Sequence, residues 1–178
     1  IFLVTPTFNS VKVAAAGLVV ALTAKGLFLT EGKEYRTDYS NASRTQLFNI
    51  FDLKWDAEIC KLFGIDPANM AEVTDSDACF GETDFEGLLP HKIPIHGVLG
   101  DSHGSLFGQG CLQPGMIKST YGTGSSIMMN IGEKPILSTH GVVTSLAWKI
   151  GGKVNYVLEG NLNYTGAVIT WLKDDLQI

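Results

Sequence analysis

The sequence predicts a fold of the α/β class, and three observations support this prediction. The chain has 178 residues, enough for one domain or the parts of two, with a buried core. Hydrophobic residues make up 45% of it and charged residues 17%, a composition that is too apolar for a disordered chain. Segments with strand-like and helix-like patterns alternate along the chain, and glycine and proline separate them.

An apolar segment near the N-terminus, residues 13–24, is bounded by Lys12 and Lys25. It is well short of the about 20 residues that a bilayer span needs, and neither a basic start nor a cleavage site marks a secretory signal. We therefore expect a buried helix here and no membrane segment. The chain opens on Ile1 rather than on methionine, so we expect it to be an internal piece of a longer protein.

The next part of the chain predicts short elements with polar connections. Residues 31–33 are typical of a hairpin turn that leads into a strand over residues 35–39. A polar corner over residues 40–44 follows, and residues 45–50 are apolar enough for another short strand.

A helix is predicted to begin after Asp56, whose side chain can cap it, and to end at Gly64. Its apolar residues Ile59, Leu62 and Phe63 would share one face.

The region after this helix changes in character. Asp66 and Pro67 predict a second capped helical turn, and residues 72–91 are acidic and loop-like. The later elements are predicted to be a strand over 93–99, a small-residue helix over 106–111, strands over 116–121 and 126–130, a hairpin over 142–148 and 154–159, and a closing helix over 164–176.

Charge and cysteine usage exclude several classes of function. Lys and Arg total 13 against 18 for Asp and Glu, so the net charge of −5 offers no basic surface for a nucleic acid. The three cysteines, Cys60, Cys79 and Cys111, have no Cys-x-x-Cys spacing. This pattern indicates neither a disulfide framework nor a zinc site and favours the reducing cytoplasm.

The segment Gly100-Asp101-Ser102-His103-Gly104 permits three interpretations. It matches the Gly-x-Ser-x-Gly elbow of serine hydrolases, but the only later histidine, His140, is crowded into one loop with the acid Glu133. It could also be a plain strand-to-helix turn with a capping aspartate. In a kinase, Asp101 could accept the proton of a substrate hydroxyl and help to hold magnesium.

A second segment, Gly122-Thr123-Gly124, lies between two predicted strands. Its backbone N–H groups and the threonine hydroxyl could bind a phosphate chain, although a tight hairpin turn would have the same composition. It is not a Walker A loop, because Met116 stands where the lysine would follow the glycines Gly110 and Gly115.

Several motifs, taken in their order and spacing, resemble the FGGY family of carbohydrate kinases over residues 30–178. They are Thr37-Asp38-Tyr39-Ser40-Asn41-Ala42-Ser43-Arg44-Thr45, Gly100-Asp101, Leu106-Phe107-Gly108-Gln109, Thr120-Tyr121-Gly122-Thr123-Gly124, Gly132-Glu133-Lys134 and Asn155-Tyr156-Val157-Leu158-Glu159-Gly160.

The resemblance implies an ATP-dependent phosphotransferase with the ribonuclease H-like, actin-like ATPase fold, whose two lobes enclose a cleft. Residues 1–110 would be the C-terminal part of the first lobe, and residues 111–178 the N-terminal part of the second. The N-terminal phosphate loop and the adenine-binding segment of the family have no counterpart in this sequence, so we expect the chain alone to be inactive.

The resemblance also assigns roles to individual residues. It implies that Asp101 is the catalytic base and a ligand of the substrate hydroxyl, and the same carboxylate is the one that we expect to hold magnesium. Ser102 and Ser126 would contact the substrate, and His103 is close enough in sequence to reach it. The ATP contacts would be Gly122, Thr123, Gly124, Gly166 and Thr170.

The expected substrate is a sugar or a polyol. Ser126 stands where glycerol kinases place an aromatic residue, and Ser102 and Thr170 stand where they have glutamine. The departures at Ser126 and Ser102 favour a longer, xylulose-like substrate, with glycerol as the alternative. A serine esterase and a catalytically silent interaction domain of actin-like fold remain as hypotheses from other classes. The resemblance leaves a homodimer open.

Overall fold

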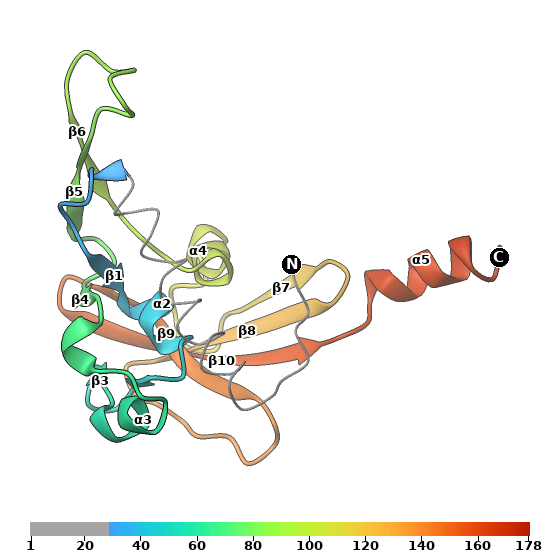
Figure 1. Cartoon of the computed structure of the whole chain (residues 1–178). Coiled ribbons are helices and arrows are strands. Elements are labelled where there is room, and N and C mark those ends of the chain that lie inside the picture. The colour runs from blue at the N-terminus through green and yellow to red at the C-terminus, as the bar shows by residue number, and fades with distance from the viewer. Residues whose placement is uncertain (1–28) are drawn as a thin grey trace. The chain divides into compact units, whose positions relative to one another are not determined.

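The structure, a computed structural model, describes residues 29–178 and divides into two compact units (Figure 1). The first unit extends to Leu99 and also contains Trp148–Gly152; the second contains Gly100–Ala147 and Lys153–Ile178. The helix predicted over residues 13–24 lies outside the described residues. The lobe boundary expected after residue 110 stays a prediction.

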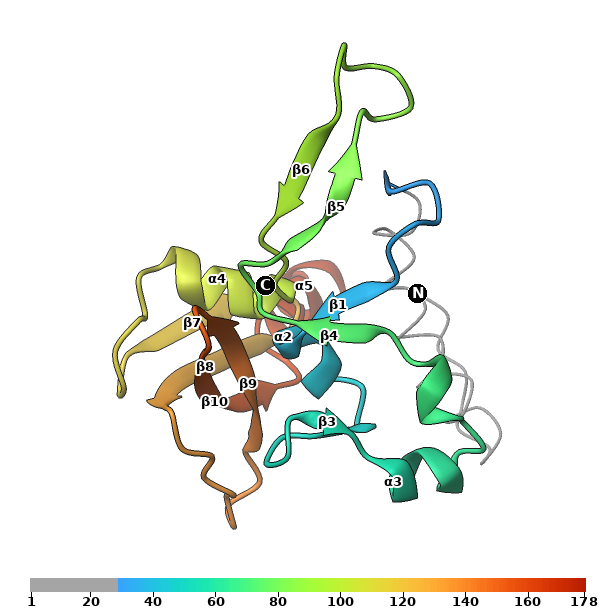
Figure 2. The same cartoon turned by 90° about the vertical axis from the view of Figure 1, so that its left-hand side faces the viewer.

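A pair of parallel strands lies at the centre of the first unit (Figure 2). Strand β1 (Arg36–Asp38) pairs with β4 (Glu72–Thr74), and Thr37 lies opposite Val73. Helix α2 (Tyr39–Ser43) follows β1 without a connecting loop, so the polar corner expected over residues 40–44 was wrong. The polar residues form a helix because Asp38 caps its N-terminus.

The cap at Asp38 is fully buried and accepts four hydrogen bonds. The donors are the backbone N–H of Ser40 at 3.0 Å, the backbone N–H and the amide Nδ2 of Asn41 at 3.1 and 2.6 Å, and Ser76 Oγ at 2.8 Å. One carboxylate therefore joins β1, α2 and the segment after β4.

Replacing this carboxylate should strongly destabilise the first unit. We expect Asp38→Ala to lower the free energy of unfolding by about 2–4 kcal/mol, since it leaves buried donors without an acceptor. Asp66→Ala is the matched control: Asp66 caps a short helix through one exposed bond to Ala68 N, and its loss should cost about 1 kcal/mol or less. Urea unfolding measures the free energy of unfolding of both variants. An equal decrease in the two would contradict the prediction.

The prediction of a helix capped by Asp56 is confirmed. Helix α3 (Ala57–Leu62) begins after Asp56, whose carboxylate accepts bonds from Glu58 N and Ile59 N at 3.0 and 2.9 Å. These bonds, that to Ile59 above all, lower the pKa of Asp56. Leu62, expected on the buried face, is 73% exposed.

The buried side of this region is a small apolar cluster. The expected strand over residues 45–50 is reduced to β2 (Phe48–Asn49), which pairs with β3 (Lys54–Trp55). The cluster consists of Leu47, Cys60, Trp55, Ile59, Phe63, Ile65 and Met70. The short 3₁₀ helix η1 (Pro67–Asn69) follows it, with Asp66 as the predicted cap.

The acidic loop expected over residues 72–91 was wrong, because two strands lie within it. Besides β4, strand β5 (Cys79–Thr83) pairs antiparallel with β6 (Ile93–His96) and forms a hairpin. Phenylalanine, cysteine and threonine suit strand pairing, which outweighs the charge of this segment.

The second unit contains a four-stranded sheet (Figure 2). The strands, in order across it, are β7 (Ile117–Tyr121), β8 (Ser125–Gly132), β10 (Lys153–Leu162) and β9 (Val143–Ile150), of which the end of β9 belongs to the first unit. Each was predicted, and β8 and β10 run further than expected. Buried Leu106, Met128, Leu146 and Val157 supply apolar side chains within this unit.

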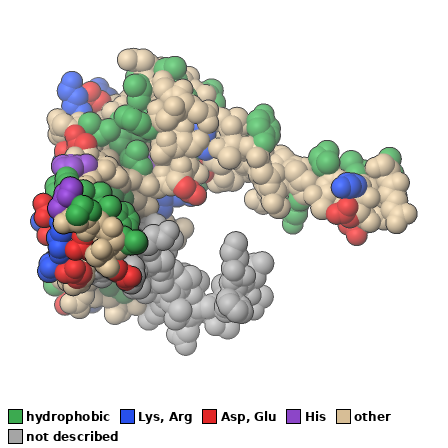
Figure 3. All heavy atoms as spheres, turned by 90° about the horizontal axis from the view of Figure 1, so that it is seen from above, with side chains coloured by type: hydrophobic (Ala, Val, Ile, Leu, Met, Phe, Trp, Pro, Cys, Tyr) green, Lys and Arg blue, Asp and Glu red, His purple; other side chains and the backbone are tan. Residues whose placement is uncertain are grey.

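Two helices accompany the sheet. Helix α4 (Asp101–Gly108) begins five residues earlier than expected, so the Gly-Asp-Ser-His-Gly segment forms its first turn. Helix α5 (Gly166–Asp174) matches the predicted closing helix. Hydrophobic side chains are visible on the surface of the C-terminal segment (Figure 3), and Ile169 is 65% exposed. No helix within residues 29–178 combines the length and the apolar character that a bilayer crossing requires.

Candidate active site

Asp101 is the first residue of α4, and its side chain is exposed. The preceding Gly100 has no side chain to cap the helix. An anionic group is favoured at this position, because the unpaired N–H groups and the dipole of a helix concentrate positive charge at its N-terminus. The carboxylate accepts a bond of 2.6 Å from Ser102 N. The Asp101 carboxylate thus has one bond to the first turn of its helix and remains open to a ligand.

The side chain of His103 points into the second unit. It is 3% exposed, and its Nε2 lies 3.3 Å from Ser145 Oγ on β9. This bond ties α4 to the sheet, so the substrate contact expected for His103 stays a prediction.

The geometry does not favour the esterase hypothesis. A serine nucleophile needs a histidine base within hydrogen-bond reach. His103 bonds to Ser145, and the exposed His140 bonds through Nδ1 to Thr139. Neither of these bonds joins Ser102.

The turn between β7 and β8 has free donors. Gly122 N bonds to Gly124 O at 2.8 Å, while the N–H groups of Thr123 and Gly124 have no hydrogen bond to any of residues 29–178. The Thr123 side chain is exposed. Adjacent unpaired N–H groups in such a turn can bind a phosphate oxygen.

The start of α5 docks against the same turn. Gly166 N donates to Gly122 O at 2.9 Å, and the N–H groups of Thr165 and Ala167 donate to Thr123 O at 3.0 and 3.1 Å. The carbonyl groups of the turn are therefore used inside the protein, and its free N–H groups remain for a ligand.

Two glycines make this close approach possible. A β-carbon at Gly166 would lie 2.4 Å from Gly122 O, and one at Gly124 would lie 2.6 Å from Leu162 O. Thr170 lies one helical turn after Gly166, is exposed and donates to Gly166 O at 3.3 Å. The structure thus joins four of the five expected ATP contacts in one turn-helix junction and places Thr170 on the following turn.

A charged cluster that the sequence analysis missed lies on the sheet. Lys118 is 1% exposed, and its ammonium donates to Thr120 Oγ1 at 2.7 Å. Burial lowers the pKa of Lys118, whereas the negative charges of Glu159 and Asp101 act to raise it. The signal in the sequence was a lysine at an inward position of a strand.

Ser126, expected to contact the substrate, belongs to the same cluster. Its hydroxyl donates to Glu159 Oε1 at 2.9 Å. Ser126 and Glu159 thus form a hydrogen-bonded pair on the face of the sheet that also carries Lys118. Residues 29–178 contain no cluster of three or more His, Cys, Asp or Glu side chains that could hold a metal.

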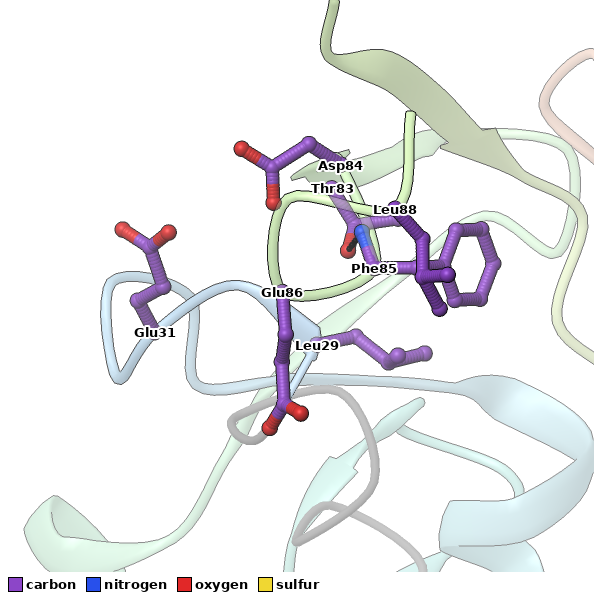
Figure 4. A pocket seen from close by; sticks show the side chains of 7 residues that line it. All are labelled: Leu29, Glu31, Thr83, Asp84, Phe85, Glu86 and Leu88. Atoms are coloured by element: carbon purple, nitrogen blue, oxygen red, sulfur yellow. Dashed lines mark hydrogen bonds between the residues drawn. The ribbon is translucent and has the colours of Figure 1, made fainter. Parts of the chain in front are cut away.

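A separate pocket of about 180 Å³ lies in the first unit (Figure 4). Phe85 and Leu88 lie next to each other in it, and the carboxylates of Glu31, Asp84 and Glu86 point away from them. Hydrogen bonds from Lys33 and Lys92 lower the pKa of Glu31. Because three carboxylates surround this pocket, it is poorly suited to a phosphate chain.

Comparison with known proteins tests the resemblance to the carbohydrate kinases. Residues 15–108 match the N-terminal domain of the FGGY family of carbohydrate kinases. The chain belongs to this family. It is 53% identical to glycerol kinase 1 of Thermotoga maritima and 50% identical to the glycerol kinase of Carboxydothermus hydrogenoformans, each over 150 residues. These alignments cover 84% of this chain and 30% of each relative, so the chain spans about a third of their length.

Solved structures of FGGY kinases have the same fold. The glycerol kinase of Plasmodium falciparum with ADP is 36% identical, with a TM-score of 0.80 over 88% of this chain and 31% of that one. The ligand-bound xylulose kinase of Lactobacillus acidophilus is 18% identical, with a TM-score of 0.74 over 85% of this chain and 31% of its own. The family and the actin-like ATPase fold predicted from the sequence are confirmed, and this chain contains a part of that fold.

Proposed function

We propose that this chain supplies the catalytic base and part of the phosphate-binding site of an ATP-dependent kinase that phosphorylates a hydroxyl group of a sugar or polyol. The observation that carries the proposal is the exposed Asp101 carboxylate at the uncapped N-terminus of α4, in the same unit as a glycine turn with two free N–H groups. Family membership supports it.

The chemistry assigned to Asp101 is general base catalysis. Its carboxylate accepts the proton of the substrate hydroxyl, whose oxygen forms a bond to the γ-phosphorus of ATP as the bond to ADP breaks. Thr123 and Gly124 bind the phosphate chain through their N–H groups. Magnesium, when bound with ATP, would neutralise charge on the phosphates. The Asp101 carboxylate could hold it, because Mg²⁺ prefers oxygen ligands and is usually bound by only one or two protein carboxylates together with the phosphates of the substrate.

The substrate is proposed at the level of sugars and polyols, with two candidates. The relatives named glycerol kinase favour glycerol. The polar Ser126 favours a longer, xylulose-like substrate, because a serine leaves more room and more water than an aromatic side chain would. Location in the cytoplasm belongs to the same proposal, and the three cysteines are free thiols.

The test is ADP release from Mg-ATP by the full-length protein that carries this chain, with glycerol, erythritol, xylulose, ribulose and gluconate supplied separately. We expect release with at least one of them. Release with glycerol alone would favour the first candidate, and release with xylulose the second. ATP binding without release would indicate another sugar, and the absence of both would refute the kinase.

A further inference from the structure

The hydrogen bond between Ser126 and Glu159 fixes what Ser126 can offer to a ligand. Ser126 lies on β8 and Glu159 on the adjacent β10, and Ser126 Oγ donates to Glu159 Oε1 at 2.9 Å. A serine hydroxyl has a single proton and two lone pairs. Because the proton is used within the protein, Ser126 can only accept a hydrogen bond from a ligand.

The direction of this bond is set by its surroundings. Glu159 is 5% exposed, and a carboxylate accepts but does not donate. Lys118 on β7 and Glu159 on β10 both lie opposite Met128 on β8, so the three residues share one face of the sheet, with Met128 between the two charged ones. A buried carboxylate needs hydrogen-bond donors, and the Ser126 hydroxyl supplies one to Glu159.

Ser126 is accessible and belongs to the same unit as the proposed base. It is half-buried, whereas Glu159 behind it is buried. Ser126 lies opposite Thr120, the residue that binds the Lys118 ammonium, and Lys118 also interacts with the charge of Asp101. Helix α4, which begins with Asp101, packs against β7. Strand β7 therefore contacts both α4, which begins with Asp101, and β8, which carries Ser126.

We propose that Ser126, oriented by Glu159, is a specificity-determining acceptor for a hydroxyl group of a neutral polyol or sugar, and that Glu159 is its positioning residue. The inference rests on the proposed function and deepens it by specifying the substrate group. A carbonyl or carboxylate at this position has no proton to donate, and its lone pairs would lie against those of Ser126. Among matched compounds, the protein should prefer sorbitol to gluconate.

Steady-state kinetics on the full-length protein test this proposal, with sorbitol, gluconate and the five compounds named above. We expect Ser126→Ala and Glu159→Gln each to raise KM for the preferred neutral substrate about tenfold, with a smaller change in kcat. The double variant should be no worse than either single variant, since Glu159 acts through Ser126. Ser126→Thr, which keeps the hydroxyl, should stay near the wild-type value.

Ser119→Ala is the matched control. Ser119 lies on β7, next to Lys118 and so on the opposite face, and its buried hydroxyl has no hydrogen-bond partner in the described part of the chain. The same substitution there should leave KM unchanged. An unchanged KM in Ser126→Ala, additive effects in the double variant, or a preference for gluconate would overturn the proposal. If Glu159→Gln fails to fold, the KM of Ser126→Ala alone tests the proposal.

Equilibrium binding separates this proposal from the proposed function. Isothermal titration of the same compounds into wild type and variants reports the subsite without any turnover. Weaker binding to Ser126→Ala supports the subsite even in a protein that releases no ADP, an outcome that would refute only the kinase. Turnover with equal binding to wild type and Ser126→Ala would retain the kinase and overturn the subsite. The absence of binding by every compound would also overturn the subsite.

Discussion

Asp101→Asn should abolish phosphoryl transfer in the full-length protein and leave nucleotide binding intact. Asparagine has nearly the same shape, but it cannot accept the substrate proton. Loss of a general base typically costs 10²–10⁴-fold, and we expect kcat to fall at least about 10³-fold, equivalent to about 4 kcal/mol in the barrier. ADP binding should change by less than about threefold, because the free N–H groups of Thr123 and Gly124 are untouched.

Two controls make this measurement specific. Asp174→Asn repeats the same chemical change at the exposed C-terminal end of α5, where removal of a negative charge is harmless to the helix. Ser102→Ala should keep kcat within an order of magnitude, whereas loss of a serine nucleophile would cost about a million-fold. Retained turnover in Asp101→Asn would show that another group is the base.

The sequence was sufficient where structure depends on local chemistry. Asp56 and Asp66 were recognised as caps because a short acceptor before a helical segment satisfies the first N–H groups. The strands around Gly122-Thr123-Gly124 and around Gly151-Gly152 were recognised because alternating residues flank tight glycine turns. The motifs that include Asp101 and Thr123 identified the family by their order and spacing along the chain.

The sequence was insufficient where distant residues determine the outcome. The cap at Asp38 depends on Ser76, which is 38 positions away, so helix α2 was mistaken for a polar corner. β5 pairs with β6 within a segment whose acidity suggested a loop. Lys118 and Glu159 were missed because only the alignment of three strands brings them to one face. Long-range pairing, rather than propensity, thus brought Lys118 and Glu159 to one face of the sheet.

Gly166→Ala should remove nucleotide binding by displacing α5 from the turn. The new β-carbon would lie 2.4 Å from Gly122 O and 3.2 Å from Gly122 C, distances that require the backbone to move. Any such movement lengthens the bonds from Gly166 N to Gly122 O and from Ala167 N to Thr123 O, which hold the turn against the helix. Overpacking of this kind typically costs about 1–3 kcal/mol, and we expect ADP affinity to fall at least tenfold.

Gly108→Ala is the matched control for this substitution in a helix. No atom lies within 4 Å of a β-carbon at Gly108, and alanine is favoured over glycine in a helix by roughly 0.5–1 kcal/mol, so stability should be unchanged or slightly higher. Isothermal titration with ADP and thermal unfolding of both variants separate a local effect from a global one. A folded Gly166→Ala protein with wild-type ADP affinity would show that the phosphate chain binds elsewhere than at Thr123 and Gly124.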